Sequence, residues 1–387
     1  MIPYGKQNIT EPDIASVVEV LQSDWLTQGP MVPKFEQTVA TYVGAQYAVA
    51  VNSATSALHI ACLALDLGPG DWLWTSPITF VASANCALYC GAKVDFVDID
   101  SATYNLSVEA LSVKLEQAER LGTLPKIVIP VHFSGQSCDM VAIYALSKRY
   151  GFKIIEDASH AIGARYQGKA IGGTEYSDIT VFSFHPVKII TTGEGGMALT
   201  NNPVLAQRMQ LLRSHGVTRD EERMQGPIPG GWYYEQLDLG FNYRMTDLQA
   251  ALGSSQMQRL EQFVTRRREI ARVYDHALHG LPLILPYQHP DNDSAYHLYV
   301  VQVDPKRPSV GRGELFQALR NAGIGVNVHY IPVHMQPYYQ KLNFHRSQRF
   351  TEAERFYANA ITLPLFFGLQ PEEQQLVVDS LCNLLQA

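Results

Sequence analysis

Short apolar runs alternate with segments of helix length from Thr10 to about Val264. A short apolar run between turn residues is typical of a buried strand, and the segments between the runs are long enough for helices. Strands that alternate with helices predict an α/β fold, with a largely parallel sheet covered by helices on both faces. The expected strands are residues 47–51, 72–76, 93–98, 127–132, 153–156 and 179–184, and the expected helices are residues 11–23, a segment from about 54, 82–90 and 140–150.

A different pattern begins after a polar stretch rich in glycine and proline at residues 218–231. A long helix is expected from about Thr246 to Leu278, followed by strands at 298–303 and 325–329 and helices at 313–321, 351–359 and 371–385. A chain of 387 residues exceeds the length at which one hydrophobic core keeps growing. We therefore predict a large domain over residues 1–255 and a smaller α+β domain over residues 256–387.

The composition favours a cytoplasmic globular protein over several other classes. Apolar residues make up 46% and charged residues 17% of the chain, which is enough for a core without metals or disulfides. The net charge of −7 argues against a nucleic-acid surface, which needs clustered positive charge. We expect neither a secretion signal nor a membrane span, because the charged and apolar patterns of both are missing. Five cysteines without disulfide or C-x-x-C spacing fit a reducing compartment.

The first candidate site is residues 52–58, Asn-Ser-Ala-Thr-Ser-Ala-Leu, where a strand is expected to end and a helix to begin. Free amides and the positive end of the helix dipole make such a junction suitable for binding a phosphate. The small side chains let the backbone approach the anion. The alternative is an ordinary helix N-cap, because serine and threonine also cap helices that bind nothing.

Two carboxylates, Glu156 and Asp157, close the strand predicted at residues 153–156. Ligands of open α/β sheets bind at the carboxyl ends of the strands. A buried aspartate at that end needs a cation or strong hydrogen-bond donors as its partner, and a protonated pyridine nitrogen is one such partner. The alternative is that Asp157 is a structural cap.

Lys188 follows the strand that delivers Ser183, and the glycine-rich stretch 191–196 comes next. A lysine between apolar strands and glycines is desolvated, which lowers its pKa and favours the neutral amine that a Schiff base requires. The alternative is an exposed hairpin lysine. A phosphate cradle, an acid and an amine are together the protein groups that pyridoxal phosphate requires. Their order along one α/β domain therefore predicts a pyridoxal-phosphate site.

Two further residues are candidates for the same site. Phe80 follows a strand and would either stack on the cofactor ring or pack in the core. His160 follows Asp157 by three residues, within reach of the proposed ring. His329 and His334 lie five residues apart, but no histidine pair combines metal-ligand spacing with acidic or thiol partners, so we expect no metal site.

The sequence resembles the sugar-nucleotide aminotransferases of the DegT type, which share the aspartate aminotransferase fold, also called fold type I. The resemblance runs from about Tyr4 to the C-terminus and is most specific at residues 25–30 (WLTQGP), 52–58 (NSATSAL), 156–161 (EDASHA) and 183–188 (SFHPVK). Within the family the chain looks most similar to the 4-aminotransferases of pseudaminic acid synthesis, through residues 157–163, 190–192 and 322–330. The resemblance implies a mostly parallel seven-stranded sheet, a smaller C-terminal domain, and a homodimer with two sites built from both subunits.

The resemblance also implies residue roles. Lys188 would form the Schiff base with pyridoxal 5′-phosphate, Asp157 would bind the pyridinium nitrogen, and His160 would lie near the ring oxygen. The phosphate of the cofactor or of the sugar nucleotide would be held by Ala54, Thr55 and Ser183. Asn242 would reach across to the cofactor and substrate of the partner's site. The nucleotide-sugar pocket would be lined by Tyr4 of the N-terminal segment, Asp24, Trp25, Leu26, Thr27, Val328, His329, Tyr330 and Ile331. Ile331 departs from the lysine that commonly follows His-Tyr in this subfamily.

The implied reaction is a ping-pong amino transfer. L-Glutamate would convert the cofactor to its pyridoxamine form, which would then aminate C4 of a UDP-linked 4-keto-6-deoxy-N-acetylhexosamine. One alternative is another sugar-nucleotide 3- or 4-aminotransferase of the same family. A second is a non-catalytic sugar-nucleotide sensor with the same fold. Relatives that dehydrate their substrate carry histidine in place of the Schiff-base lysine, so Lys188 argues against that reaction.

Overall fold

The computed structural model describes residues 1–307, 310–342 and 349–386 of the chain. A seven-stranded sheet lies at its centre, with the strand order β1-β9-β8-β5-β4-β2-β3. Only β9 runs antiparallel to its neighbours in this sheet, so the prediction of an α/β fold with a largely parallel sheet is confirmed. The strands are β1 (Tyr47–Val51), β2 (Trp72–Thr75), β3 (Lys93–Phe96), β4 (Ile127–Ile129), β5 (Lys153–Asp157), β8 (Ile179–Ser183) and β9 (Gly196–Thr200).

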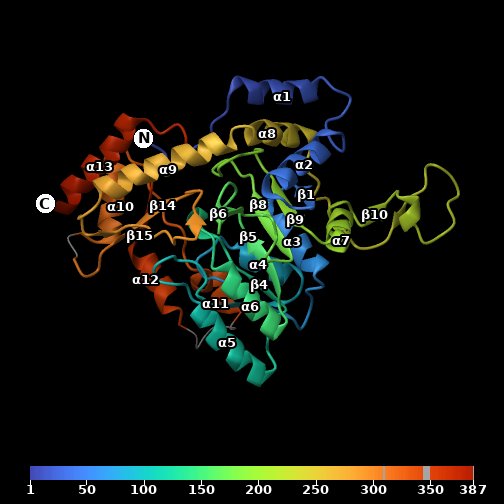
Figure 1. Cartoon of the computed structure of the whole chain (residues 1–387), viewed down its shortest axis with the longest axis horizontal. Coiled ribbons are helices and arrows are strands. Elements are labelled where there is room, and N and C mark those ends of the chain that lie inside the picture. The colour runs from blue at the N-terminus through green and yellow to red at the C-terminus, as the bar shows by residue number, and fades with distance from the viewer. Residues whose placement is uncertain (308–309, 343–348, 387) are drawn as a thin grey trace.

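Helices cover both faces of the sheet, which gives three layers (Figure 1). Residues of one strand alternate between the faces: Ile127 and Ile129 of β4 pack in one core cluster, and Val128 packs in the other. The first cluster includes residues of α3 (Ala54–Ala64), α4 (Ala82–Tyr89) and α7 (Pro203–Arg213), and the second includes residues of α2 (Met31–Val43), α5 (Val108–Leu121), α6 (Met140–Tyr150) and α8 (Asp247–Met257).

A separate helix, α1 (Glu11–Leu21), lies across α8 at the outside of these layers (Figure 1). Thr10 precedes it as expected, and its amide donates a hydrogen bond of 2.8 Å to the carboxylate of Asp13. The same buried carboxylate accepts bonds from Ser255 at 2.7 Å and from Arg259 at 2.6 Å. A buried carboxylate is stable only with such partners, so Asp13 holds α1 against the end of α8.

The C-terminal part of the chain has its own core around a three-stranded sheet in the order β12-β14-β15. The N-terminus belongs to this core as well, because Ile2 packs in it and the Ile2 amide donates to the carbonyl of Gly323 at 2.8 Å. The division of the chain at residue 255 stays a prediction. The elements of this part are α9 (Leu260–Ala277), β12 (Leu283–Ile284), β14 (Tyr299–Val303), α10 (Arg312–Asn321), α12 (Thr351–Asn359), β15 (Ala360–Leu363) and α13 (Pro371–Gln386).

Two predicted elements are wrong. The long helix at 246–278 is two helices, because the chain leaves helical geometry at Arg259, whose φ is −112° and ψ is 7°, between α8 and α9. The strand predicted at 325–329 is replaced by isolated contacts: the Gly325 amide donates to the carbonyl of Ile2, and Asn327 pairs with Thr362. Neighbouring residues thus bind different segments, so residues 325–329 cannot form a continuous strand pairing. In the sheet, β14 pairs with β15.

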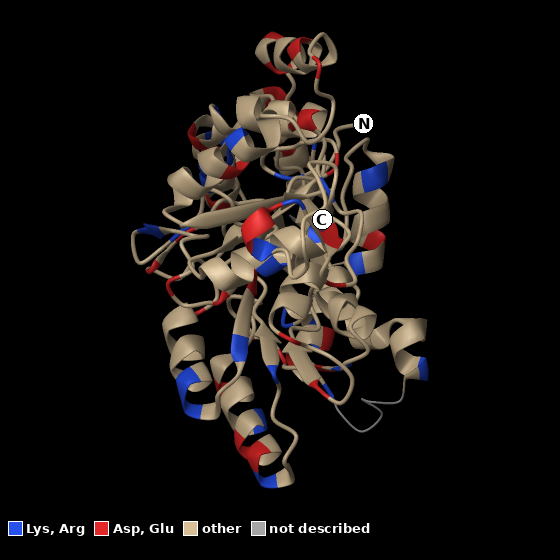
Figure 2. Ribbon diagram, turned by 90° about the vertical axis from the view of Figure 1, so that its right-hand side faces the viewer, with Lys and Arg blue, Asp and Glu red and all other residues tan. Residues whose placement is uncertain are grey.

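An arm of residues 217–240 projects from the body beyond α7 (Figure 1). It carries β10 (Val217–Thr218), η2 (Glu221–Arg223) and β11 (Glu235–Gln236). Acidic and basic residues are interspersed along the helices of the molecule (Figure 2). Within the described ranges, no helix has both the length and the apolar character needed to cross a membrane. The remaining short elements are β6 (Arg165–Tyr166), β7 (Lys169–Ala170), β13 (Asn292–Asp293), η1 (Phe133–Gly135), η3 (Val333–Met335) and α11 (Pro337–Lys341).

Candidate active site

The carboxyl ends of β1, β5 and β8 point to the same edge of the central sheet, where a cavity of about 480 Å³ opens. Asp157 is the last residue of β5 and Ser183 the last of β8, and these strands are parallel neighbours. The topology therefore brings both residues to the cavity, as expected for an open α/β sheet. The predicted site residues that line it are Tyr4, Ala54, Thr55, Phe80, Asp157, His160, Ser183, Lys188, His329 and Tyr330.

Lys188 lies in the loop between β8 and β9, where its amide donates to the carbonyl of His185 at 2.8 Å and closes a tight turn. Its side chain is partly buried and lines the cavity. Burial lowers the pKa of Lys188 to about 8, although the nearby carboxylate of Asp157 acts in the opposite direction. Far more of this amine than of an ordinary lysine is therefore neutral near physiological pH, and the neutral amine is the form that attacks a carbonyl carbon.

Asp157 and Glu156 lie on opposite faces of the sheet because successive strand residues alternate. Asp157 faces the cavity, and its carboxylate accepts hydrogen bonds from the hydroxyl of Ser83 at 2.6 Å and from the amide of Ser159 at 3.1 Å. Glu156 faces the other side and binds the ring of His132 at 2.7 Å. Only Asp157 is thus placed to bind a molecule in the cavity, and its two donors orient the carboxylate.

The turn after β1 leads directly into α3. Ser53 caps this helix, because its side chain accepts a hydrogen bond from the amide of Ser56 at 3.1 Å. The amides of Ala54 and Thr55 lie in the first turn, where a helix has no carbonyl acceptor for them. A Cβ atom at Gly196 would lie 2.4 Å from the nitrogen of Ala54, so only glycine lets β9 approach this turn. The turn both caps α3 and lines the cavity, and its amides are available to an anion.

His160 is oriented by two hydrogen bonds. Its Nδ1 accepts from the amide of Ser134 at 3.2 Å, so the ring proton lies on Nε2, which is 3.1 Å from the hydroxyl of Tyr330. Burial and the nearby Lys188 lower the pKa of His160 well below its ordinary value, which keeps the ring neutral. Burial raises the pKa of Tyr330, so its hydroxyl keeps its proton. Since that hydroxyl accepts from His160, its own proton is free to bond a molecule in the cavity.

Phe80 lies at the mouth of the cavity with 60% of its surface exposed, so it is not the core residue of the alternative interpretation. Its ring centroid lies 6.4 Å from that of Tyr330, at an interplanar angle of 56°. An exposed ring at the mouth of a cavity is placed to contact a bound planar group.

Several predicted residues do not line the cavity within one chain. Thr27 pairs with Thr246, and the carbonyl of Leu26 accepts from Asp247, so residues 24–27 lie against the start of α8. Asn242 pairs with Ser214 near the base of the projecting arm. The full set outside the cavity is Asp24, Trp25, Leu26, Thr27, Asn242, Val328 and Ile331.

The structure adds residues that the sequence patterns did not single out. Ser83 lies in the predicted helix 82–90 and binds Asp157. The sequence held one signal for it, a hydroxyl in the first turn of a helix that follows a strand. His297 lies two residues before β14 and packs on His160, with ring centroids 4.4 Å apart. No spacing or motif indicated His297.

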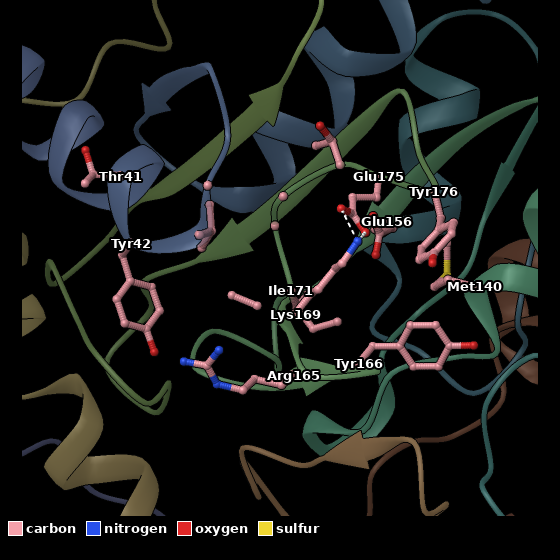
Figure 3. Close-up of a pocket in the computed structure, with 16 residues that line it drawn as sticks. Thr41, Tyr42, Met140, Glu156, Arg165, Tyr166, Lys169, Ile171, Glu175 and Tyr176 are labelled. Carbon is pink, nitrogen blue, oxygen red and sulfur yellow. Dashed lines mark hydrogen bonds and ion pairs between the residues drawn. The ribbon is translucent and has the colours of Figure 1, made fainter.

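A second cavity, of about 390 Å³, lies on the other side of β5, between the end of α2 and the hairpin β6–β7 (Figure 3). Its lysine, Lys169, forms an ion pair with Glu175 at 2.6 Å, which raises the pKa of Lys169. Glu156 at its floor already accepts from His132, Ser177 and Thr180. A protonated, paired lysine is a poor nucleophile, so the chemistry is better assigned to the cavity that holds Lys188.

The cavity at Lys188 fits pyridoxal 5′-phosphate by the chemistry of its groups. A lysine of lowered pKa suits the aldehyde, a buried carboxylate with two donors suits a protonated ring nitrogen, and the helix amides beside Gly196 suit the phosphate. Among the described residues, no three His, Cys, Asp or Glu side chains are grouped closely enough to hold a metal ion.

The chain matches the family described as the DegT/DnrJ/EryC1/StrS aminotransferase family over residues 7–382. It is 42% identical to the spore coat polysaccharide biosynthesis protein SpsC of Bacillus subtilis, in an alignment that covers 100% of this chain and 97% of that protein. It is 36% identical to the UDP-4-amino-4,6-dideoxy-N-acetyl-beta-L-altrosamine transaminase of Campylobacter jejuni, over 100% of this chain and 98% of that enzyme.

Solved structures agree with these sequence matches. Helicobacter pylori PseC, described as an aminotransferase involved in the biosynthesis of pseudoaminic acid, superposes with a TM-score of 0.91 at 30% identity, over 100% of this chain and 99% of that one. The sugar aminotransferase Spr1654 of Streptococcus pneumoniae, described as putative and solved in a PLP form, superposes with a TM-score of 0.88 at 31% identity, over 100% of this chain and 98% of that one. The predicted fold type I and the predicted cofactor are both confirmed.

Proposed function

The chain belongs to the DegT/DnrJ/EryC1/StrS aminotransferase family of pyridoxal-phosphate enzymes, and from this premise we propose that it aminates C4 of a UDP-linked 4-keto-6-deoxy-N-acetylhexosamine with L-glutamate as the donor. The product would be UDP-4-amino-4,6-dideoxy-N-acetyl-β-L-altrosamine, for pseudaminic acid synthesis in the cytoplasm. The names of the Campylobacter enzyme and of PseC support this substrate. The observation that carries the proposal is the single cavity shared by Lys188, Asp157 and the first turn of α3.

The roles of the chain's own groups follow from their chemistry. Bound pyridoxal phosphate supplies an electron sink for the pair released when a C–H bond beside an amino group breaks. Asp157 would hold the proton of the ring nitrogen, with its carboxylate oriented by Ser83 and Ser159. Lys188 would attach the cofactor between turnovers. Its amine would also take the proton from the α-carbon of glutamate and return one to C4 of the sugar.

The remaining wall would bind the rest of the cofactor and the sugar. Ala54, Thr55 and Ser183 would hold phosphate oxygens through amides and a hydroxyl. His160, whose Nε2 proton is donated to Tyr330, would lie near the ring oxygen of the cofactor. Phe80 would stack against the cofactor ring. The sugar would lie against Tyr4, His329 and Tyr330.

We propose that the working enzyme is a homodimer whose sites combine both subunits. Among the described residues that line the cavity, Lys188 is the only lysine or arginine, so one chain supplies little positive charge for a diphosphate. Asn242 pairs with Ser214 and does not line the cavity of its own chain, so it would be available to the partner's site. The segment 24–27 with Val328 and Ile331 would complete the nucleotide-binding wall of that shared site.

A panel of keto-sugar nucleotides tests the substrate. Purified enzyme is incubated with glutamate and each of several UDP- and TDP-linked 3-keto and 4-keto sugars, and the amino-sugar product is identified by mass spectrometry and NMR. We expect the UDP-linked 4-keto-6-deoxy-N-acetylhexosamine to give the highest kcat/KM. A clear preference for a 3-keto sugar or for a TDP-linked sugar would replace the substrate proposed here. The Lys188→Ala variant serves as the control, in which turnover and the colour of the bound cofactor are both lost.

A further inference from the structure

His297 lines the active-site cavity but has no part in the roles assigned so far. Only 5% of the residue is exposed, and its Nδ1 atom is buried without a hydrogen-bond partner. Buried polar atoms in folded proteins nearly always have a partner, and an exception at a cavity calls for a functional explanation. A phenylalanine would fill the same space without leaving a polar atom unpaired.

The backbone around His297 fixes the ring in place. The carbonyls of Tyr296 and His297 both accept hydrogen bonds from Arg267, at 3.2 Å each. On the opposite side, Gly135 has a φ of +102°, and a Cβ there would lie 2.9 Å from the nitrogen of Tyr296 and 3.1 Å from that of His297. Glycine therefore permits a close contact between η1 and this segment. Contacts that hold a residue in one position are typical of side chains that bind a ligand.

The ring of His297 presents an N–H donor to the cavity. A buried N–H group without an acceptor costs more free energy than a buried lone pair without a donor. The buried Nδ1 atom of His297 is therefore unprotonated. The proton then lies on Nε2, the ring nitrogen that a molecule in the cavity can reach. Burial, together with the nearby His160, Lys188 and Arg267, lowers the pKa of His297 well below its ordinary value. The ring therefore stays neutral.

His297 is the end of a continuous wall of uncharged rings. Its ring packs on His160, whose ring stacks on Tyr330 at 6.1 Å; Tyr330 contacts His329 at 4.9 Å, and His329 contacts Tyr4 at 5.4 Å. Burial lowers the pKa of His329 to about 3 and raises that of Tyr330, so this wall carries hydroxyl and N–H groups but no charge. Lys188 lies near these rings but is not part of the wall, and the helix amides of α3 come from another element. An uncharged wall of hydrogen-bond donors suits a sugar ring better than a carboxylate or a phosphate.

We propose that His297 is a specificity-determining residue, which donates a hydrogen bond from Nε2 to an uncharged oxygen, a hydroxyl or an acetamido carbonyl, of the sugar in the acceptor nucleotide. This inference rests on the proposed function, because it takes the acceptor to be a nucleotide-linked sugar. The proposed hydrogen bond would form in the sugar half-reaction and not in the glutamate half-reaction, because glutamate carries no sugar.

Two variants test the inference. His297→Phe keeps a ring but removes the donor, and His297→Gln keeps an N–H group near the position of Nε2. We expect His297→Phe to lower kcat/KM of the sugar half-reaction about five- to tenfold more than that of the glutamate half-reaction, the effect of one neutral hydrogen bond. His297→Gln should recover most of that difference. The absorbance of the bound cofactor and the melting temperature report separately on cofactor binding and folding.

A binding measurement separates failure of this inference from failure of the proposed function. The Kd of the holoenzyme for UDP-N-acetylglucosamine is measured by calorimetry, and it should rise about fivefold in His297→Phe and less in His297→Gln. If the wild type aminates no keto-sugar, the proposed function is wrong, and the ratio of Kd values still decides the role of His297. Equal losses in both half-reactions with an unchanged Kd would overturn the inference, and so would a sugar half-reaction of wild-type efficiency in His297→Phe.

Discussion

The hydroxyl of Ser83 donates a hydrogen bond of 2.6 Å to Oδ2 of Asp157, from the first turn of α4 to the end of β5. A carboxylate only accepts, so the Ser83 proton is committed to this bond. Thr79, whose Oγ1 lies 2.7 Å from Ser83 Oγ, must then donate to Ser83. All three residues are buried, so a short chain of hydroxyl groups stabilises the charge of Asp157.

Ser83→Ala should weaken the proposed role of Asp157 without removing the carboxylate. Loss of the donor leaves the buried carboxylate one hydrogen bond short and less firmly oriented. A hydrogen bond to a charged group contributes about 1.5–3 kcal/mol, so we expect kcat to fall at least roughly tenfold. Stopped-flow absorbance of the glutamate half-reaction measures this rate. Thr79→Val, which removes only the second hydroxyl, is the matched control and should show a smaller effect. A wild-type rate in Ser83→Ala would contradict the argument.

Lys188 makes cofactor capture by the apoenzyme dependent on pH. Burial lowers its pKa to about 8, so the reactive neutral amine increases as the pH rises from 7 to 9. We expect the rate at which apoenzyme develops the absorbance of bound pyridoxal phosphate to rise over this range, with a midpoint near pH 8. Asp157→Asn removes the carboxylate that raises the pKa of Lys188, and should therefore move the midpoint to lower pH. A midpoint near that of an ordinary lysine, above pH 10, would show that Lys188 is not desolvated.

The α/β layer could be predicted because each of its elements has a local apolar pattern. The predicted strand 47–51 and helix 140–150 agree with β1 and α6 at both ends. Asp157, Lys188 and the turn at 52–58 stood out for the same reason, since each is a polar break at or shortly after the end of an apolar strand. Parallel strands then place such breaks at one edge of the sheet.

The features of the fold and of the site that the sequence did not predict depend on contacts between distant parts of the chain. The break at Arg259 accompanies an ion pair with Asp13, 246 residues earlier in the sequence. The strand expected at 325–329 is prevented by Ile2, which binds Gly325. His297 reaches the cavity only because Gly135 lets its segment approach His160. No pattern within a short window of sequence contains these partners.

Gly196→Ala should weaken phosphate binding. The added Cβ would lie 2.4 Å from the nitrogen of Ala54 and 2.5 Å from the carbonyl carbon of Ser53, and both atoms are backbone, so the turn must move. We expect the Kd for pyridoxal phosphate to rise at least about tenfold, because the amides would no longer converge on one anion. Equilibrium dialysis of the apoenzyme measures this Kd. Gly68→Ala is the control, because a Cβ at Gly68 has no atom within 4 Å. Equal Kd values in the two variants would argue against a phosphate at this turn.

Glu156 should contribute to stability rather than to catalysis. Its carboxylate accepts from Ser177, from Thr180 at 2.9 Å, and from Nε2 of His132 at 2.7 Å, on the face of β5 away from Lys188. Nδ1 of His132 accepts from the amide of Cys138 at 3.2 Å, which places the ring proton on Nε2, the donor to Glu156. Glu156→Leu would leave three donors without this acceptor, and two of them, His132 and Thr180, are fully buried.

We therefore expect Glu156→Leu to lower the free energy of unfolding by about 3–5 kcal/mol, measured from urea denaturation at fixed protein concentration. Glu156→Gln should cost less, because the amide oxygen still accepts from His132 and the hydroxyls of Ser177 and Thr180 can turn to accept from the amide nitrogen. Glu175→Gln breaks the exposed pair with Lys169 in the same cavity (Figure 3) and should leave the urea midpoint near that of the wild type. A Glu156→Leu protein as stable as Glu175→Gln would show that these buried bonds contribute little.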